Sequence, residues 1–386
     1  MKQTRLGGWR RLAVWLTTIT LTLAGPVAAV ATPAAAQDDR LPRGELGALL
    51  DEMVAAGLPG AIGLARSGND TWRGASGLAV DGSQREMRPT DRWGVGSMTK
   101  MAVATVVLQL AGEGRLGLDD PVERWLPKLV PNGRNITLRQ LLNHSSGLYN
   151  YTDDLKVFKP YLDGNVGFTW TPRQLVKIAV KDHDPLFPPG DHHSYSNTGY
   201  VLLGLVIEKV TGTSLGTQLR RRVFEPLDLQ GTSFAIPRRV TGSLVHGYLI
   251  GLGPDGGMLD ATEWNPSWEW AAGAMTSTAD DLARFLRALL RGRLLPSKML
   301  DQMLTTIPAG TPGFRYGLGI AAIDTPCGTL WGHDGSDQYQ TWVLNSRDAD
   351  RQVVMMVNAT DQAGEVQTLV LDQVARAHCL LQGLPA

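Results

Sequence analysis

The alternation of apolar and polar positions predicts helices in the middle of the chain and strands near both ends. The most apolar helical pattern begins behind Ser97, runs through Met101–Leu110 and is expected to end near Gly112 and Gly114. Further segments with helical spacing, several of them preceded by a capping residue or followed by a glycine, are 45–56, 137–142, 171–181, 197–210, 214–223, 277–291 and 364–379.

Period-two alternation predicts strands in two places. Strands at 61–66 and 71–80 flank the turn residues Ser67–Asp70. In the C-terminal part, strands are expected at 316–323, 329–331, 338–344 and 352–357. Strands at both ends with helices between them indicate an α+β chain, in which one mixed lobe is built from both termini and carries a helical insertion. We expect residues 44–96 and 270–386 to form the mixed lobe, and residues 97–269 to form a mostly helical second lobe.

Composition and charge narrow the class of protein. The chain has 386 residues, of which 43% are apolar and 19% charged, so it can bury a large core. Its 37 basic and 37 acidic residues form no basic stripe, which argues against a nucleic-acid partner.

The N-terminus has the order of an export signal. A basic start precedes the apolar run Leu12–Ala24, and Ala34–Ala36 fits an A-x-A-type cleavage site. We therefore expect residues 1–36 to be a signal peptide, residues 37–43 to be a linker, and the mature protein to be secreted without a stable membrane anchor. The alternative is an uncleaved anchor, but the apolar run is short and interrupted by threonines.

Cys327 and Cys379 are the only cysteines, and both lie in the part expected to be exported. In an oxidising compartment they can pair, which would contribute about 4 kcal/mol to stability in the chain-entropy model. Two buried thiols are the alternative. The spacing matches no C-x-x-C redox or zinc motif.

The segment Ser97-Met98-Thr99-Lys100 carries the first candidate chemistry. At the start of a helix, a serine and a lysine three residues apart lie on one face, so the amine can reach the hydroxyl. The helix N-terminus also favours developing negative charge. The alternative is a capping serine beside a solvated lysine, because S-x-x-K arises by chance on many helices.

Two other segments hold polar groups suited to catalysis, and a third holds a histidine. Tyr195-Ser196-Asn197 offers a phenol that can exchange protons and an amide that can donate to a carbonyl. In Trp331–Ser336, a backbone amide after the glycine can face an oxyanion, although D-G-S is also ordinary turn chemistry. His144 has the pattern of a structural histidine rather than a catalyst.

Together these segments resemble the serine penicillin-recognising enzymes, in particular the branch of class C β-lactamases and secreted actinomycete D-alanyl-D-alanine carboxypeptidases. That branch has S-x-x-K, Y-x-N and K-T-G or H-x-G in this order, as do Ser97–Lys100, Tyr195–Asn197 and His333–Gly335. The resemblance covers about 44–380, includes the L-L-x-H-x-S-G-L pattern at 141–148, and is strongest to the carboxypeptidases, also in the placement of the cysteines.

The resemblance implies a β-lactamase/transpeptidase-like fold, with an antiparallel sheet flanked by helices and the active site between the two lobes. It implies that Ser97 is the acylated nucleophile, that Lys100 relays its proton, and that Tyr195 is general base and then general acid. The amides of Ser97 and Ser336 would form the oxyanion hole. The implied substrate-binding residues are Asn197, His333, Gly335, Ser336 and Trp268.

Two positions depart from the carboxypeptidase pattern. Asp334 stands where those enzymes usually have threonine, and Ala321 aligns with their carboxylate-binding arginine. Both changes remove favourable contacts to a substrate carboxylate, and Asp334 adds repulsion on the order of 1 kcal/mol. Arg315 lies upstream and is a candidate to compensate.

We therefore predict a secreted serine D-alanyl-D-alanine carboxypeptidase that acts on peptidoglycan stem peptides or binds β-lactams. The alternatives are a class C-like β-lactamase, an esterase of the same fold and a catalytically silent binding protein. We expect a monomer with no cofactor and no metal. Asp191-His192-His193 makes a poor zinc site because adjacent histidines on a loop point to different sides.

Overall fold

An eight-stranded sheet runs through the protein, in the strand order β2-β1-β13-β12-β11-β10-β9-β8, and its neighbouring strands pair antiparallel throughout. The structure is a computed structural model that describes residues 41–236 and 244–385. The predicted signal peptide lies outside the described residues. The described residues form one unit, within which the division into two lobes stays a prediction.

The strands are β1 (Gly60–Ser67), β2 (Asp70–Gly77), β3 (Trp93–Gly94), β4 (Ser233–Phe234), β5 (Tyr248–Ile250), β6 (Met258–Asp260), β7 (Met275–Ser277), β8 (Ile307–Pro308), β9 (Phe314–Tyr316), β10 (Ala321–Thr325), β11 (Gly328–Ser336), β12 (Gln340–Asn345), β13 (Arg351–Val357) and β14 (Ala359–Thr360). The α-helices are α1 (Arg43–Ala55), α2 (Thr99–Gly112), α3 (Val122–Trp125), α4 (Leu138–Leu142), α5 (Lys159–Leu162), α6 (Pro172–Lys181), α7 (Asn197–Thr211), α8 (Leu215–Leu219), α9 (Ala279–Leu290), α10 (Ser297–Leu304) and α11 (Glu365–Leu380).

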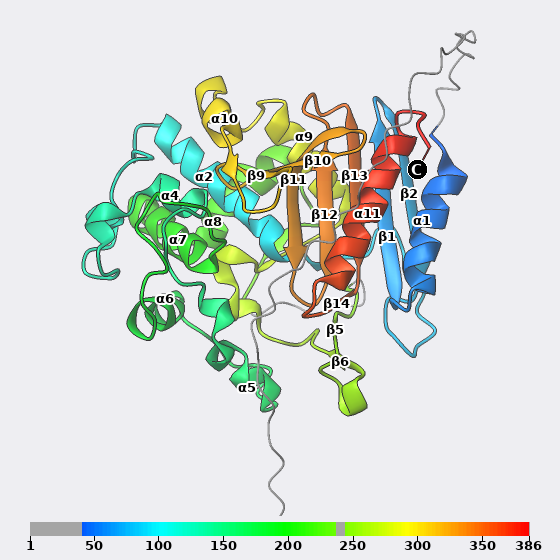
Figure 1. The fold of residues 1–386 in the computed structure, drawn as a ribbon, viewed down its shortest axis with the longest axis horizontal. Helices are drawn as coiled ribbons and strands as arrows, with labels where there is room; N and C mark the ends of the chain where they lie inside the picture. Colours follow the sequence, from blue (N-terminus) through cyan, green and yellow to red (C-terminus); the bar gives the residue numbers. More distant parts are fainter. Residues whose placement is uncertain (1–40, 237–243, 386) are drawn as a thin grey trace, which may run out of the picture. The chain divides into compact units, whose positions relative to one another are not determined.

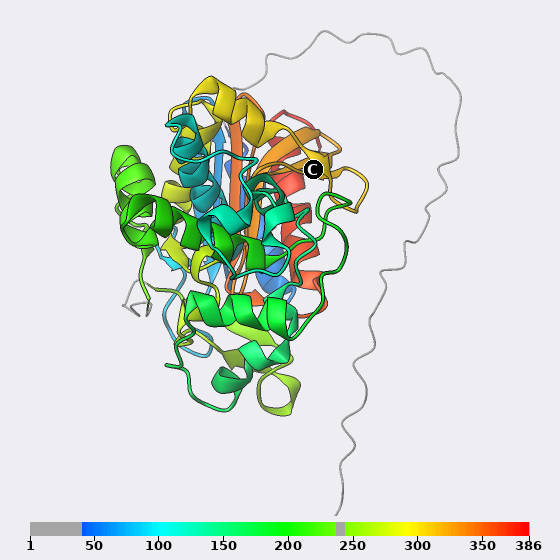
Figure 2. The same cartoon turned by 90° about the vertical axis from the view of Figure 1, so that its left-hand side faces the viewer.

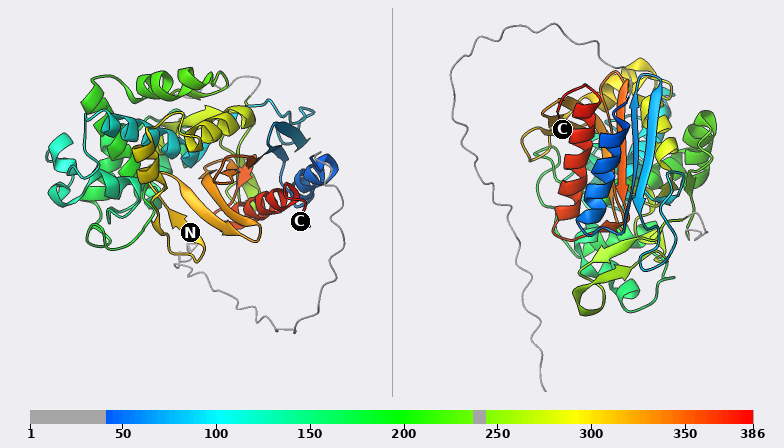
Figure 3. Two further views of the ribbon diagram at one scale, coloured as in Figure 1. Left: turned by 90° about the horizontal axis from the view of Figure 1, so that it is seen from above. Right: turned by 90° about the vertical axis from the view of Figure 1, so that its right-hand side faces the viewer.

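Helices cover both faces of the sheet. The terminal helices α1 and α11 pack on each other and on one face, as the right-hand view of Figure 3 shows, while α9 contacts β1, β12 and β13. Strand β13 explains this arrangement, because successive side chains of a strand point to opposite faces. Val353 and Met355 join the core beneath α1 and α11, whereas Val354 and Met356 join the core that includes α9. The predicted α+β class is confirmed.

The helical part lies beside strands β9–β11 (Figure 1) and is seen in front of the sheet in Figure 2. Helix α2 is its centre, with Thr99–Leu108 buried, and it packs against α7, α8 and α10. Thr137 and Thr171, which begin the helical segments predicted at 137–142 and 171–181, cap α4 and α6, each in a full capping box. Among the helices of the described residues, none has the length and apolar character needed to cross a membrane.

Three expected elements differ from the structure. The strand predicted at 316–323 is two strands, β9 and β10, separated by a tight turn at Gly317–Ile320. The strand predicted at 329–331 extends to Ser336, since β11 pairs with β10 along its first part and with β12 along its second. The helix predicted at 214–223 is α8 followed by a π-helical turn at Arg220–Phe224.

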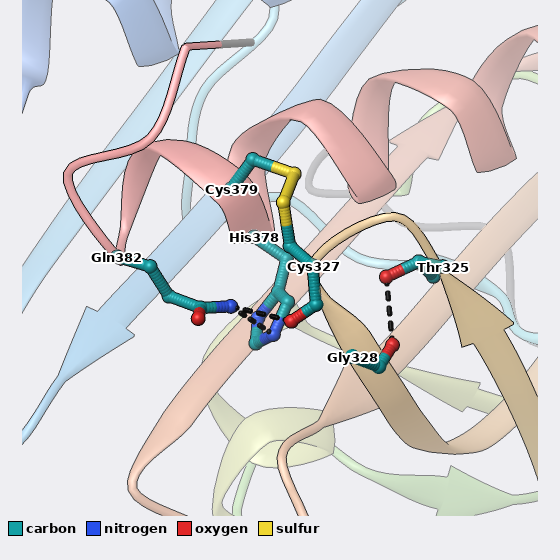
Figure 4. Close-up of a disulfide and its surroundings, with 6 residues drawn as sticks. All are labelled: Thr325, Cys327, Gly328, His378, Cys379 and Gln382. Atoms are coloured by element: carbon teal, nitrogen blue, oxygen red, sulfur yellow. Dashed lines mark hydrogen bonds between the residues drawn. A yellow bond between two sulfur atoms is a disulfide. The ribbon is translucent and has the colours of Figure 1, made fainter. Parts of the chain in front are cut away.

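Cys327 and Cys379 form a disulfide that ties the β10–β11 turn to the end of α11 (Figure 4). Beside it, the Gln382 side chain donates to the Cys327 carbonyl oxygen. The bond therefore fastens the C-terminal helix to the start of β11, the strand whose other end carries the candidate site.

Candidate active site

Ser97 lies in a single 3₁₀ turn, η1 (Gly96–Met98), that leads directly into α2. The turn is held from two sides: the amide of Val95 donates to the carbonyl oxygen of Met275, and the amide of Met275 donates to Thr99 Oγ1. Because β3 also pairs with β7, the approach to Ser97 is fixed to the β7 segment. The apolar pattern behind Ser97 buries α2 and so anchors the turn.

The structure brings Ser97, Lys100 and Tyr195 together. Lys100 Nζ and the Tyr195 hydroxyl each lie 2.8 Å from Ser97 Oγ. Lys100 Nζ also donates to the carbonyl oxygen of Ala272 at 2.8 Å, and it lies 4.8 Å from the centre of the Tyr195 ring. A serine with a buried amine and a phenol on its oxygen has the geometry of an activated nucleophile.

The environment shifts the pKa values of both partners of Ser97. Burial lowers the pKa of Lys100 to about 7, against the opposing influence of the Glu269 and Asp334 carboxylates. Burial raises the pKa of Tyr195 well above its ordinary value, and the negative charge of Asp334 adds to the rise. Near pH 7, Lys100 is therefore partly neutral and can accept a proton, while Tyr195 keeps its own.

The end of β11 lies against the Ser97 turn. A methyl group added to Gly335 would lie 2.0 Å from the carbonyl oxygen of Val95, and one added to Gly96 would lie 3.1 Å from the amide nitrogen of Ser336. Only glycine permits this approach on the β11 side. The amides of Ser97 and Ser336 consequently belong to two backbone segments in direct contact, as an oxyanion hole requires.

Asn197 is the first residue of α7 and is held by Asn150 and by Thr152 of the turn η3 (Tyr151–Asp153). Its side-chain Nδ2 donates to Thr152 Oγ1 at 3.0 Å, and its main-chain amide donates to Asn150 Oδ1 at 2.9 Å. Asn197 follows Tyr195 by two residues and is only partly buried. These bonds fix the orientation of the Asn197 side-chain amide.

His333 is buried, with 1% of its surface exposed, and both ring nitrogens have protein partners. Nδ1 lies 2.5 Å from the carbonyl oxygen of Asp334, and Nε2 lies 2.6 Å from the Tyr316 hydroxyl. A carbonyl oxygen only accepts, so Nδ1 carries a proton. Tyr316 is a site residue that the sequence analysis missed, because it lies at the break between β9 and β10.

The Asp334 side chain is 18% exposed and is held by Gln367 of α11, whose Nε2 donates to Oδ2 at 2.7 Å. Burial acts to raise the pKa of this carboxyl, but the bonds from His333 and Gln367 outweigh it and the net shift is downward. Asp334 is therefore an anion at neutral pH, and its charge reaches Lys100 and Tyr195.

Arg315 does not compensate for this negative charge. Its guanidinium forms two hydrogen bonds, of 2.7 and 2.9 Å, to the carboxylate of Asp324 on β10. Ala321 pairs with Tyr316 and Gly332 inside the sheet and is buried. The positions considered as carboxylate partners in the sequence thus offer no cation to the site.

Trp268 and His144, two further residues singled out in the sequence, are buried. Trp268 is 7% exposed and packs edge-on against Phe158, and its carbonyl oxygen accepts from the Tyr151 hydroxyl at 2.6 Å. The ring of His144 lies 4.2 Å from that of Tyr195, and its Nδ1 accepts from the amide of Ser196. Burial lowers the pKa of His144 well below its ordinary value, which fits a neutral packing partner.

The part of the chain that the structure describes contains no group of three histidine, cysteine, aspartate or glutamate side chains placed to bind a metal. His192 lies 3.0 Å from Asp191 and packs on Phe187, whereas the ring of His193 lies near His144. The adjacent histidines thus have different neighbours.

The fold and this cluster define a serine hydrolase. The family model described as Beta-lactamase matches residues 46–375, and the chain belongs to the beta-lactamase family. Among curated relatives, penicillin-binding protein 4* of Bacillus subtilis is 25% identical over 336 residues, covering 81% of this chain and 70% of that protein. Esterase EstB of Burkholderia gladioli is 29% identical over 312 residues, covering 70% of this chain and 76% of that protein.

One solved structure is more similar to this chain in sequence than the curated relatives named above. The D-stereospecific amidohydrolase from Streptomyces sp. is 41% identical, with a TM-score of 0.79 over 86% of this chain and 98% of that one. Alignments to three curated relatives, PbpX of Bacillus subtilis among them, span 62% to 76% of those proteins' lengths. The expected resemblance to penicillin-recognising enzymes and the serine hydrolase class are confirmed.

Proposed function

We propose that this enzyme hydrolyses amides of D-configured acyl groups through an acyl-enzyme on Ser97, and that its leaving group carries no carboxylate. The observation that carries the proposal is the anionic Asp334, whose charge influences Lys100 and Tyr195 and which stands at the position where the carboxypeptidase pattern has threonine.

The acylation step follows from the placement of the protons. Neutral Lys100 accepts the proton of Ser97 as Oγ bonds to the substrate carbonyl carbon, and the amides of Ser97 and Ser336 stabilise the oxyanion. This proposal gives Lys100 the role of base that the resemblance implied for Tyr195, because Lys100 is partly neutral near pH 7 whereas Tyr195 keeps its proton. Tyr195 then gives its proton to the leaving amine as the C–N bond breaks, and Lys100 restores it. Water reverses the sequence, releasing the acid and regenerating Ser97.

Asp334 disfavours a substrate with a carboxylate on its leaving group. If the leaving-group carboxylate lay about 8 Å from Asp334, the two charges would repel by about 2 kcal/mol at an effective dielectric constant of about 20, which is roughly a 30-fold loss in binding. With Arg315 engaged by Asp324 and Ala321 buried in the sheet, no cation among these positions offsets it. Ammonia and simple amines as leaving groups avoid this loss.

The relatives support the substrate class. One solved relative is named a D-stereospecific amidohydrolase and a curated relative is named an esterase, and neither name requires a carboxylate on the leaving group. Amides and esters of D-amino acids are therefore the substrates that we propose to test first.

The second candidate is the D-alanyl-D-alanine carboxypeptidase predicted from the sequence, with β-lactams as ligands. It is favoured by the three motifs in their order and by the relative named penicillin-binding protein 4*. It requires that a substrate carboxylate be accommodated beside Asp334.

Steady-state kinetics with matched substrates separates the two candidates. We expect turnover of D-phenylalanine amide with a strong preference over its L-enantiomer, and little release of D-alanine from an acyl-D-alanyl-D-alanine peptide. Asp334→Thr is expected to raise kcat/KM for the peptide by about 30-fold, by removing the repulsion of about 2 kcal/mol. If wild-type enzyme prefers the peptide, the carboxypeptidase assignment stands instead.

We also propose that the mature protein acts outside the cytoplasm. The order of basic, apolar and small residues in 1–36 supports export, and the Cys327–Cys379 disulfide suits an oxidising compartment. N-terminal sequencing of the protein secreted by its host tests this, with a mature chain beginning at about residue 37 as the expected result.

A further inference from the structure

A strained segment supplies the second hydrogen-bond acceptor of Lys100. Trp270 opens the 3₁₀ turn η9 (Trp270–Ala272) with φ of +38°, a backbone conformation rare for a bulky residue, and its ring packs directly over Gly204 of α7. Such strain persists where the surroundings impose it, and it often marks a functional segment. The carbonyl oxygen of Ala272, at the end of this turn, accepts from Lys100 Nζ.

Glu269 directly precedes the strained residue, and its carboxyl group folds back over the end of the turn. A methyl group added to Gly273 would lie 2.3 Å from Glu269 Oε1, so the carboxylate lies against Gly273, the residue that follows Ala272. Glu269 is buried, with 5% of its surface exposed, although a charged residue is rarely buried unless it is paired. The turn thus brings a buried carboxylate close to the carbonyl that holds Lys100.

We propose that Glu269 is a positioning residue that provides the buried counter-charge of Lys100 and so sets how readily this amine takes the proton of Ser97. The sequence pattern alone did not indicate a role for Glu269. The inference rests on the proposed function in one respect, which is that Lys100 accepts the proton of Ser97.

Among the groups around Lys100, Glu269 is the main source of negative charge. Several elements contribute titratable or charged groups that contact Lys100 or act on it electrostatically. These residues are Ser97, His144, Tyr195, Tyr200, Glu269 and Asp334. His144 is neutral and the two tyrosines keep their protons because burial raises their pKa values. Of the two carboxylates, Glu269 raises the pKa of Lys100 more than Asp334 does, and without it burial would dominate further.

The test is a direct titration of Lys100 in the Glu269→Gln variant. Lysine labelled with ¹³C at Cε reports each side chain by NMR, and Lys100→Arg assigns the signal. We expect a midpoint of about 7 in the wild type and a decrease of about one unit in Glu269→Gln, because the neutral amide no longer favours the charged amine. Glu263→Gln, the same change at an exposed residue of the same segment, should leave the midpoint unchanged.

An unchanged or higher midpoint in a folded Glu269→Gln protein would overturn the proposal. If that variant does not fold, Glu269→Asp keeps the charge but shortens its reach, and it should lower the midpoint by a smaller, measurable amount. No shift in Glu269→Asp would then overturn the proposal as well.

A kinetic readout connects the titration to the reaction. The acid limb of the kcat/KM profile for a neutral p-nitrophenyl ester should move to lower pH by the same shift, so that at pH 6 the rate relative to its plateau rises about fivefold. A purely structural role for Glu269 would lower the plateau without moving the limb. Failure to hydrolyse D-amino acid amides would refute the proposed function, whereas the titration needs no substrate and tests Glu269 separately.

Discussion

Gly335→Ala is a small change for which the structure predicts a large effect on catalysis. Gly335 lies in β11 where the strand meets the Ser97 turn, and an added methyl group would lie 2.0 Å from the carbonyl oxygen of Val95. Contacts of a side-chain Cβ closer than 3.0 Å essentially do not occur, so the two segments must separate by about 1 Å.

The strand has little freedom to move away, because β11 pairs with β10 and β12. The separation therefore falls between Ser97 and Ser336, whose amides are proposed to hold the oxyanion. Loss of one such donor costs about 10²–10³-fold in kcat, whereas overpacking by one methyl group lowers the free energy of unfolding by about 1–3 kcal/mol. We expect the kinetic loss with a modest decrease in stability.

The assay is the burst and steady-state release of p-nitrophenol from a neutral ester, beside a thermal melt. Gly167→Ala, at a glycine with open space around its added methyl group, is the matched control and should behave as the wild type. A folded Gly335→Ala enzyme with kcat within about threefold of the wild type would refute the assignment of the oxyanion hole to this contact.

Three other predictions follow from the geometry. Lys100→Met should abolish activity and yet stabilise the fold near neutral pH. The pKa of Lys100 is about 7 in the folded protein and 10.5 in the unfolded chain, so the unfolded state binds more protons between these values and the stability of the wild type rises with pH. Denaturant titrations at pH 7 and 9.5 should find this rise flattened in the variant. Tyr195→Phe should reduce kcat for amides by about 10²–10⁴-fold but much less for p-nitrophenyl esters, whose leaving group needs no proton, and equal losses in parallel assays would contradict its role as the acid. Replacing Cys327 and Cys379 by serine should lower the free energy of unfolding by about 4 kcal/mol while kcat stays near that of the wild type, since the bond lies at the end of β11 remote from Ser97.

Local spacing was sufficient to find part of the site. Ser97 and Lys100 are one helical turn apart, so the helix behind them determines their contact whatever the rest of the chain does. Tyr195 and Asn197 have no local signal of this kind, and only the order of motifs in the family pointed to them. The disulfide followed from the small number of cysteines together with the expected compartment.

Tertiary contacts explain what the sequence analysis missed. The segment Gly332–Ser336 reads as a turn, yet pairing with β12 keeps it extended and places Asp334 in the site. Tyr316 reaches His333 because the chain turns back at Gly319, where a methyl group would lie 2.4 Å from Ala104 of α2. Period-two patterning carries no information about such an approach by a distant helix.

The contact of Glu269 with the Lys100 environment depends in the same way on the path of a remote segment. Nothing in the sequence pattern distinguishes Glu269 from an exposed glutamate such as Glu263. Its burial becomes evident only when the strained turn at Trp270 is placed against α7.

Ser97 is expected to form a covalent acyl-enzyme with D-configured substrates, and the proposed mechanism depends on this step. The most direct measurement is intact-protein mass spectrometry after rapid acid quenching of a reaction with a D-phenylalanine ester, followed by peptide mapping. We predict an added mass equal to one phenylalanyl group, located on the peptide that contains Ser97 and absent in Ser97→Ala, which should also show no turnover. An adduct on another residue, or turnover retained by Ser97→Ala, would contradict the account.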